Sequence, residues 1–345
     1  MKLTTIARQR LSNQMEFLAK HKDRLVIDAD THATDTIGMD ELFREAIRET
    51  PDYFHGRPVS AEDLIAEMDM AGVDMALIWQ NPATTLYQTD RNKNFNALLE
   101  ANRYIFETAI KYPERFIPAG WTDPKSLGTD LAIKLAAICI GEFGFPIVKM
   151  NPAQNAFSIS DETVIDVVDF IVESGAVPAF HYGADTEYTP AEGLAIIARR
   201  HPDHPVIGVH MGGGGAGYPE AEDLYQKSRK LGLVQPNIRF VLSAKRDTHI
   251  ESDLITYTLA GEPFSKNLFC GSDAPYGRMT WNFGGYRTMF DSLIKGKDHT
   301  DERVRNHPGL FTSQTAQDYM GGNFAGFIIE ISKLLLQKTE SAVVV

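Results

Sequence analysis

Ionisable side chains follow an apolar run near the start of the chain, in the segment RLVIDADTH from Arg24 to His32. Alternate residues of a β-strand point to the same face. Asp28, Asp30 and His32 are therefore expected to project together where the apolar run stops. Carboxylates and an imidazole in this position suit metal binding or proton transfer. Asp28 lies one step deeper, and we interpret it as a buried hydrogen-bond partner, with a ligand role as the alternative.

Further histidines and a carboxylate end other apolar runs of the chain. VPAFH ends at His181, PVIGVH ends at His210, and NLFCGSD ends at Asp273. If these runs are strands whose ends meet at one edge, the three residues converge with Asp30 and His32. Such a set suits a divalent metal such as zinc. An open coordination position on the metal would bind water and lower its pKa towards neutrality. The other histidines of the chain have no such placement.

The elements that must position these residues recur along the chain. Short apolar runs alternate with helix-like stretches, which predicts parallel strands joined by right-handed crossovers. Eight such units most simply close as a (β/α)₈ TIM barrel, in which functional groups sit at the carboxyl ends of the strands. A doubly wound open sheet is the alternative, but no GxGxxG motif follows the first run. The expected strands are residues 24–30, 75–80, 115–121, 146–150, 177–181, 205–210, 238–244 and 267–273.

Length and pattern predict a single α/β domain over residues 1–345. Residues 1–23 form a helical extension, residues 24–311 the barrel, and residues 312–345 closing helices. The longest irregular stretch, around residues 33–60, could cover the barrel mouth. The hydrophobic fraction of 43% is ample for a large core.

Charge and cysteine content narrow the class of protein. The formal net charge is −12 with no Lys/Arg-rich run, which argues against nucleic-acid and membrane partners and favours a small-molecule substrate. The 2 cysteines predict no disulfide framework and fit a reducing, cytoplasmic compartment. No apolar run is long enough to span a membrane. The N-terminus lacks the apolar core of a signal peptide. It is instead amphipathic, so we expect packing or a homo-oligomer interface, with a dimer as the expected state.

Several motifs together carry a resemblance that covers nearly the whole chain. In order they are IDADTH, MDMAGVDMALI, YPERFIPAG, IVKMNP, FHYG, VIGVHMGGG, CGSDAPYG and MGGNFAGFI. Their order and spacing resemble the amidohydrolase superfamily, in particular the amidohydrolase-2 branch that contains aminocarboxymuconate-semialdehyde decarboxylase and its relatives. The resemblance implies a metal-dependent barrel enzyme.

Positions in this family imply roles for the residues at the strand ends. Asp30, His32, His181 and Asp273 would be ligands of the metal or lie beside it. His210 would be a ligand or a proton-transfer residue. We expect zinc first and manganese next.

One position departs from the common family pattern. The first strand usually carries His-x-His, whereas this chain has Asp30 and His32. An acidic residue there resembles the nonoxidative decarboxylases and hydratases of the branch, which generally use one metal. Lys149 lies at the end of the fourth expected strand, where other amidohydrolases can have a carbamylated lysine that bridges two metals. In this branch the lysine is often unmodified, and we favour a salt bridge or a substrate contact.

The leading expectation for function is hydrolysis of a small carboxylated or aromatic substrate. A metal-activated water would attack a carbonyl carbon, Asp273 would accept the proton, and His210 with the metal would stabilise the oxyanion. The alternative is nonoxidative decarboxylation, or hydration, of an aromatic or unsaturated acid, with a proton delivered by Asp273 or His210. A different class remains open: an inactive barrel that serves as a binding protein.

Candidate substrate contacts are the polar and aromatic residues that follow the predicted strands. An arginine could hold a carboxylate through paired hydrogen bonds, and aromatic rings would suit a planar substrate. The candidates are Trp79, Trp121, Asn151, Tyr182, Arg246, Tyr276 and Arg278.

Overall fold

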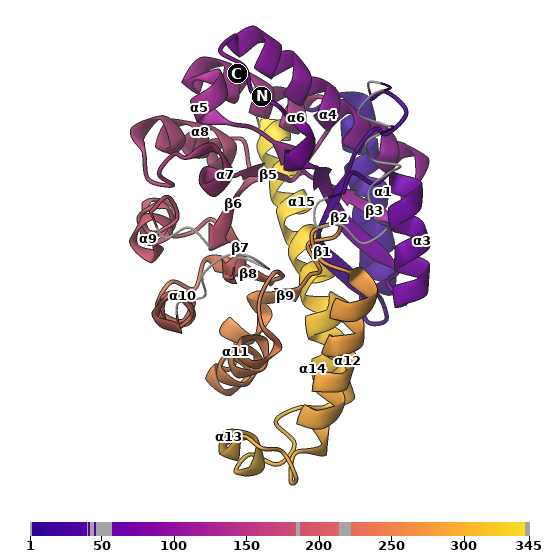
Figure 1. The fold of residues 1–345 in the computed structure, drawn as a ribbon, viewed down its shortest axis with the longest axis vertical. Helices are drawn as coiled ribbons and strands as arrows, with labels where there is room; N and C mark the ends of the chain where they lie inside the picture. Colours follow the sequence, from indigo (N-terminus) through magenta and orange to yellow (C-terminus); the bar gives the residue numbers. More distant parts are fainter. Residues whose placement is uncertain are drawn as a thin grey trace.

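Parallel strands form the wall of a (β/α)₈ barrel in the computed structural model of the protein (Figure 1). The structure describes residues 2–39, 41, 45, 57–183, 187–213 and 222–341. Much of the irregular stretch predicted around residues 33–60 lies outside these ranges. The strands are β1 (Ile27–Ala33), β2 (Met75–Gln80), β3 (Phe116–Pro118), β4 (Gly120–Trp121), β5 (Ile147–Met150), β6 (Val177–Gly183), β7 (Val206–Gly212), β8 (Ile238–Leu242) and β9 (Leu268–Cys270).

Strand pairing follows chain order. β1, β2 and β3 form one sheet and β4 to β9 form another, and every pair is parallel. β3 and β4 are the two halves of the predicted third strand. They are separated by Ala119, after Pro118, which has no N–H to donate to a ladder. Because β3 pairs with β2 and β4 pairs with β5, this interrupted strand connects the two sheets.

The barrel closes where β1 meets the segment after β9. The amide of Asp273 donates to the carbonyl of Asp30 at 2.9 Å, and the amide of His32 donates to the carbonyl of Ala274 at 2.7 Å. Thr31 and Ala274 form an isolated parallel bridge at the same place. The backbones of Asp30, His32 and Asp273, which the sequence predicts to bind metal, therefore take part in the seam of the barrel together with Thr31 and Ala274.

All eight predicted runs contain strands, but two boundaries differ in ways that matter for the site. β1 ends at Ala33 instead of residue 30, so His32 lies within the strand. β9 ends at Cys270 instead of residue 273, so Asp273 lies in the loop that follows. The backbone of Asp273 has φ 61°, which is outside the range of a strand.

Helices surround the strands, as their apolar spacing predicts. In α8, for example, Val164, Val167, Val168 and Ile171 are buried at the spacing of one helix face. The helices are α1 (Thr5–His21), α3 (Ala61–Ala71), α4 (Arg91–Lys111), α5 (Pro124–Leu127), α6 (Thr129–Gly141), α7 (Pro152–Asn155), α8 (Glu162–Glu173), α9 (Ala191–Arg200), α10 (Glu222–Val234), α11 (Asp247–Ala260), α12 (Met279–Lys295), α13 (Glu302–Arg305), α14 (Ser313–Gln317) and α15 (Asn323–Ser341).

The two ends of the chain pack together. α1 lies within the predicted N-terminal extension, and it packs on α15, which passes behind the strands in the view of Figure 1. A short π-helix, η3 (Asp318–Gly322), leads into α15 and contacts β1 and β9. These elements provide the closing helices predicted after residue 311.

Two further predictions concern membranes and disulfides. Among the described residues, no helix has both the length and the apolar character needed to cross a membrane. Cys139 and Cys270 are both buried and unbridged.

Candidate metal centre

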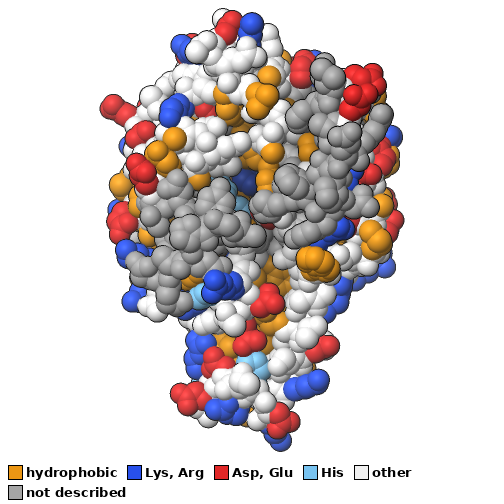
Figure 2. Space-filling view, in the orientation of Figure 1, with side chains coloured by type: hydrophobic (Ala, Val, Ile, Leu, Met, Phe, Trp, Pro, Cys, Tyr) orange, Lys and Arg blue, Asp and Glu red, His pale blue; other side chains and the backbone are white. Residues whose placement is uncertain are grey.

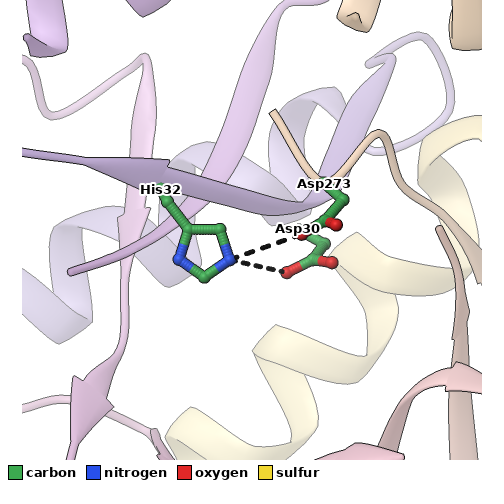
Figure 3. Close-up of side chains that lie close together, drawn as sticks. All are labelled: Asp30, His32 and Asp273. Atoms are coloured by element: carbon green, nitrogen blue, oxygen red, sulfur yellow. Dashed lines mark ion pairs between the residues drawn. The ribbon is translucent and has the colours of Figure 1, made fainter. Parts of the chain in front are cut away.

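Asp30, His32 and Asp273 bring their side chains together at the seam of the barrel (Figure 3). One donor atom from each residue lies within 4.8 Å of the other two. Two of the residues come from β1, and the third comes from the loop after β9, which the seam hydrogen bonds hold beside β1. Seen from the side of Figure 1, this face of the molecule is hollowed near its middle, and blue and pale-blue side chains (Lys or Arg, and His) are visible within the hollow (Figure 2).

The hydrogen bond of His32 fixes which of its nitrogens faces the carboxylates. Nδ1 lies 2.8 Å from the backbone carbonyl of Gln80, which can only accept, so Nδ1 carries the proton. Nε2 lies 3.5 Å from Asp273 Oδ1 and 3.8 Å from Asp30 Oδ1. Burial, and then the nearby Lys149 ammonium, lower the pKa of His32 to about 3, so the ring is neutral. The lone pair of Nε2 therefore faces two carboxylate oxygens.

This donor set fits a divalent cation. A neutral imidazole lone pair opposite two carboxylates is repulsive unless positive charge lies between them. Nitrogen and carboxylate oxygen are also ligand types that zinc and manganese accept. The hydrogen bond from Nδ1 to a carbonyl is the outer contact that a metal-binding histidine commonly makes.

Asp30 is the most heavily hydrogen-bonded of the three residues. Its Oδ1 accepts from Trp79 Nε1 at 2.9 Å and from Lys149 Nζ at 3.3 Å, and its Oδ2 accepts from Ser243 Oγ at 2.7 Å. Burial alone would raise the pKa of Asp30, but Lys149, followed by His210, outweighs it and holds that pKa well below its usual range. Asp30 is therefore a fixed carboxylate anion.

The same network assigns the proton of His210. The hydroxyl of Ser243 donates to Asp30, so its oxygen accepts from His210 Nδ1 at 2.9 Å. Nε2 is consequently the nitrogen that remains for proton transfer or for a ligand. Burial lowers the pKa of His210, although the Asp273 and Asp30 carboxylates oppose this shift.

His181 lies beside His210 on the neighbouring strand β6. The two ring centroids are 4.6 Å apart in an edge-on arrangement. Within the described parts of the chain, neither ring nitrogen of His181 makes a hydrogen bond, and burial together with His210 and Lys149 lowers the pKa of this ring. His181 is not among the donor atoms that lie within 4.8 Å of one another. Its predicted ligand role therefore stays a prediction.

Lys149 is enclosed beside Asp30. Its side chain is 1% exposed, and besides the Asp30 ion pair its Nζ lies 4.3 Å from the Trp79 ring centroid and 5.4 Å from that of Trp121. The salt bridge favoured from the sequence is therefore present. Both tryptophans are fully buried around this ammonium. The rings of Trp79 and Trp121 therefore lie against the Lys149 ammonium. Their predicted contacts with a substrate stay predictions.

The backbone around the site is unusual. His210, Met211, Ala244 and Asp273 all have positive φ, at 79°, 45°, 50° and 61°. Residues other than glycine rarely adopt this region, and such strain concentrates at functional sites. Here it turns the chain at the ends of β7, β8 and β9, where His210, Ser243 and Asp273 are presented.

Asp28 lies below the donor set and serves as a hydrogen-bond acceptor. It accepts from the amide of Ser272 at 2.9 Å, from the Ser272 hydroxyl, and from the amide of Asp30 at 3.1 Å. Burial raises its pKa to about 8, although the Ser272 bonds oppose the shift. Asp28 thus ties β1 to the segment after β9, as a hydrogen-bond partner was expected to do.

Tyr276 and Asn151 lie on loops that follow strands. The Tyr276 hydroxyl donates to Asn81 Oδ1 at 2.7 Å, and its ring centroid is 5.5 Å from that of His32. Asn151 caps α7 by accepting from the amide of Gln154 at 3.1 Å. Tyr276 is therefore beside the donor set, whereas the side-chain oxygen of Asn151 is engaged by its own helix.

The structure corrects the placement of Tyr182. Its hydroxyl is 3.0 Å from Ser228 Oγ on α10, and its ring packs on Phe240. The physical reason is strand alternation, because His181 faces the interior and the next residue must face the helices. Tyr182 is therefore not at the mouth.

The two arginines stand at helix starts. Arg246 is exposed immediately before α11, and Arg278 is half-buried immediately before α12. Their predicted contacts with a substrate carboxylate stay predictions.

Ser243 is a residue of this hydrogen-bond network that the sequence analysis does not include among the candidates. It links Asp30 to His210, yet it was interpreted only as part of a strand. The available signal was a hydroxyl directly after the apolar run IRFVL, at the same strand end as the other polar residues.

Comparison with known proteins places this site in context. A family model described as "Amidohydrolase" matches residues 27–286. A search of curated protein sequences finds no match.

Solved structures share the fold. An uncharacterized TIM-barrel protein from Bordetella bronchiseptica is 14% identical, with a TM-score of 0.61 over 89% of this chain and 99% of that chain. A 5-carboxyvanillate decarboxylase from Sphingomonas paucimobilis is 16% identical, with a TM-score of 0.57 over 88% and 98%. A dihydroxybenzoic acid decarboxylase from Polaromonas sp. JS666, with bound manganese and the inhibitor 2-nitroresorcinol, is 13% identical, with a TM-score of 0.56 over 89% and 97%.

Proposed function

Because the chain belongs to the amidohydrolase family, we propose that it is a metal-dependent decarboxylase of an aromatic carboxylic acid. The observation that carries the metal dependence is His32, whose neutral Nε2 faces the carboxylates of Asp30 and Asp273. The choice of decarboxylation is supported by the solved structures of similar fold, among them two decarboxylases of aromatic acids. This choice favours the second of the two activities that the sequence suggests, and hydrolysis becomes the alternative.

Asp30, His32 and Asp273 would hold one divalent ion, with His181 as a further ligand. Manganese is bound in the Polaromonas structure, and both manganese and zinc suit a set of carboxylates and imidazoles. When bound, the ion would supply a Lewis acid that orients and polarises oxygen atoms of the substrate.

Side chains of the protein would deliver the proton that replaces the carboxylate. In a decarboxylation the bond between the ring carbon and the carboxylate carbon breaks and CO₂ leaves. The electron pair stays on the ring carbon, which takes up a proton. His210 is our proposed proton carrier: Ser243 accepts from its Nδ1–H, and the Nε2 lone pair would take up a proton from solvent and deliver it to the ring carbon. Trp79 and Lys149 keep Asp30 in place during the reaction.

One observation keeps hydrolysis as a second candidate. The Asp273 side chain is 13% exposed at the mouth, whereas the Asp30 side chain is fully buried. A partly exposed carboxylate beside a metal site is suitably placed to accept a proton from water. Asp273 would then be the base of a hydrolase.

Product analysis separates the two candidates. The metal-loaded protein would be incubated with 2,6-dihydroxybenzoate and 5-carboxyvanillate, and in parallel with aryl esters and lactones. We expect CO₂ release from an aromatic acid, together with one deuteron on the product carbon in D₂O. Turnover of the esters or lactones without any CO₂ release would reject decarboxylation in favour of hydrolysis.

We also propose a homodimer in solution, on the basis of the amphipathic N-terminal helix. Sedimentation at micromolar concentration tests this, and a single species near 38.4 kDa would contradict it.

A further inference from the structure

Lys149 places a positive charge inside the candidate metal centre. It lies on β5, in register with Trp121 of β4 and Ala179 of β6. Its ammonium is 3.3 Å from Asp30 Oδ1, the oxygen that also faces His32 Nε2. The charge is therefore located at the donor set and not at its edge.

The surroundings of Lys149 keep its ammonium there. Trp79 contacts the ammonium through its ring face at 4.3 Å and donates Nε1–H to the same Asp30 oxygen at 2.9 Å. Trp121 adds a second ring face at 5.4 Å. A cation over an indole face is stabilised by the ring, and more so when water is excluded. With 1% exposure, the side chain is shielded from solvent, and its charge lies among the two indole rings and Asp30.

This charge matters for metal binding. Asp30 and Asp273 contribute two negative charges to the donor set, and Lys149 offsets one of them. A divalent ion held by the same residues would be repelled by the ammonium through a low-dielectric interior, where such interactions are strong.

We propose that Lys149 is a fixed cation that weakens the binding of the divalent ion at this centre. In this role the lysine acts through its charge on the Asp30 carboxylate. The inference rests on the proposed metal-dependent function, but it concerns metal affinity, which is measured without turnover.

The test is a metal titration of protein stripped with a chelator. Mn²⁺ and Zn²⁺ would each be titrated against a chromophoric competitor, for wild type and for Lys149→Met. We expect one equivalent in the wild type. In Lys149→Met the first equivalent should bind at least about tenfold more tightly, because a like charge has been removed from a buried site. Equal or weaker binding in Lys149→Met would overturn the proposal.

Two controls separate charge at the site from other effects. Lys149→Arg keeps the positive charge and should bind metal with wild-type affinity. Lys111→Met removes one positive charge from an exposed ion pair with Glu62, and it should leave the affinity unchanged. Tighter binding in Lys111→Met as well would mean that overall charge, and not Lys149, sets the affinity.

The outcomes also distinguish this proposal from the proposed function. A wild type that binds neither metal would reject both. A wild type with one equivalent, but no gain in Lys149→Met, would reject the role of Lys149 alone. If Lys149→Met folds only when metal is present, the metal replaces the missing charge and the proposal is supported. Failure to fold in either condition, for both Lys149→Met and Lys149→Gln, would contradict it.

Discussion

The two ends of the barrel differ in their contacts: the carboxyl end holds buried ionisable groups, and the amino end is closely packed. At the carboxyl end, buried ionisable groups face one another and residues such as His210 and Asp273 adopt positive φ. At the amino end, contacts are close and complementary. Gly321 of η3 lies so near β1 that an added Cβ would be 1.9 Å from the Leu25 carbonyl oxygen. We infer that close packing at the amino end stabilises the fold, whereas the positive-φ backbone at the mouth costs stability.

This contrast predicts that substitutions at the mouth change chemistry more than stability, and that substitutions at the amino end do the reverse.

Asp273→Asn is the sharpest test at the mouth. It removes one of the two carboxylates that face His32 Nε2, and turnover should fall by about two to four orders of magnitude. Asparagine tolerates positive φ, so the free energy of unfolding should change by less than about 1 kcal/mol. Steady-state kinetics and denaturant unfolding on one preparation measure both quantities. A destabilised variant with normal turnover per folded molecule would contradict the prediction that substitutions at the mouth affect chemistry more than stability.

Gly321→Ala is the corresponding test at the amino end. A methyl group that meets a backbone carbonyl cannot be relieved by a side-chain rotation, so we expect a loss of about 3 kcal/mol or more. Turnover of the folded fraction should stay normal. Gly326→Ala in α15 is the matched control, because its added Cβ meets nothing within 4 Å, and it should be neutral or stabilise by up to about 1 kcal/mol. An equal change in the free energy of unfolding for the two variants would show that the close approach of η3 to Leu25 does not cause the loss of stability.

Ser243→Ala tests the link between the metal centre and His210. It removes the donor to Asp30 Oδ2 and the acceptor of His210 Nδ1. Losses of outer hydrogen bonds at metal sites typically cost about 10–100-fold in affinity or activity, and we expect an effect in this range. Metal titration and kinetics of the variant measure it, with Ser228→Ala, whose hydroxyl contacts Tyr182 on the helix side, as the control. Unchanged metal affinity and turnover in Ser243→Ala would show that Ser243 does not support the metal centre or His210.

The smallest expected effect concerns a histidine at the amino end of β7. Burial lowers the pKa of His204 to about 4, and its Nε2 contacts the carbonyl of Ala176 at 2.8 Å. The unfolded chain, with a pKa near 6.5, binds more protons between these values. Stability should therefore rise with pH from about 4 to 6.5 and then level off. In His204→Gln the unfolding free energy should rise less steeply over this window, with activity unchanged. An identical slope in the two proteins would count against this assignment.

Features that depend on a short stretch of sequence could be predicted from the sequence alone. Apolar runs predicted every barrel strand that the described residues form, and polar residues at their ends predicted a cluster that includes Asp30, His32 and Asp273, whose donor atoms lie within 4.8 Å of one another. Features that depend on register between distant segments were not accessible. The seam between β1 and the loop after β9, and the position of Ser243 between Asp30 and His210, arise only when the barrel closes.

Tyr182 shows that position in the sequence can also assign a residue to the wrong side of a strand. It follows a strand-end histidine in sequence, which suggested a substrate contact, yet strand alternation turns it towards Ser228 and the helix layer. Adjacent residues at a strand end therefore do not share a site, and only the residue on the interior face should be assigned to it.

The central claim is that the mouth of this barrel holds a divalent metal ion through Asp30, His32 and Asp273. Elemental analysis tests it most directly, applied in parallel to the wild type and to His32→Ala after both have been stripped and reloaded with manganese or zinc. We predict one equivalent in the wild type, with activity returning on reloading, and little metal or activity in His32→Ala. A stripped wild type that is fully active without metal, or a His32→Ala variant that binds metal as the wild type does, would contradict the account.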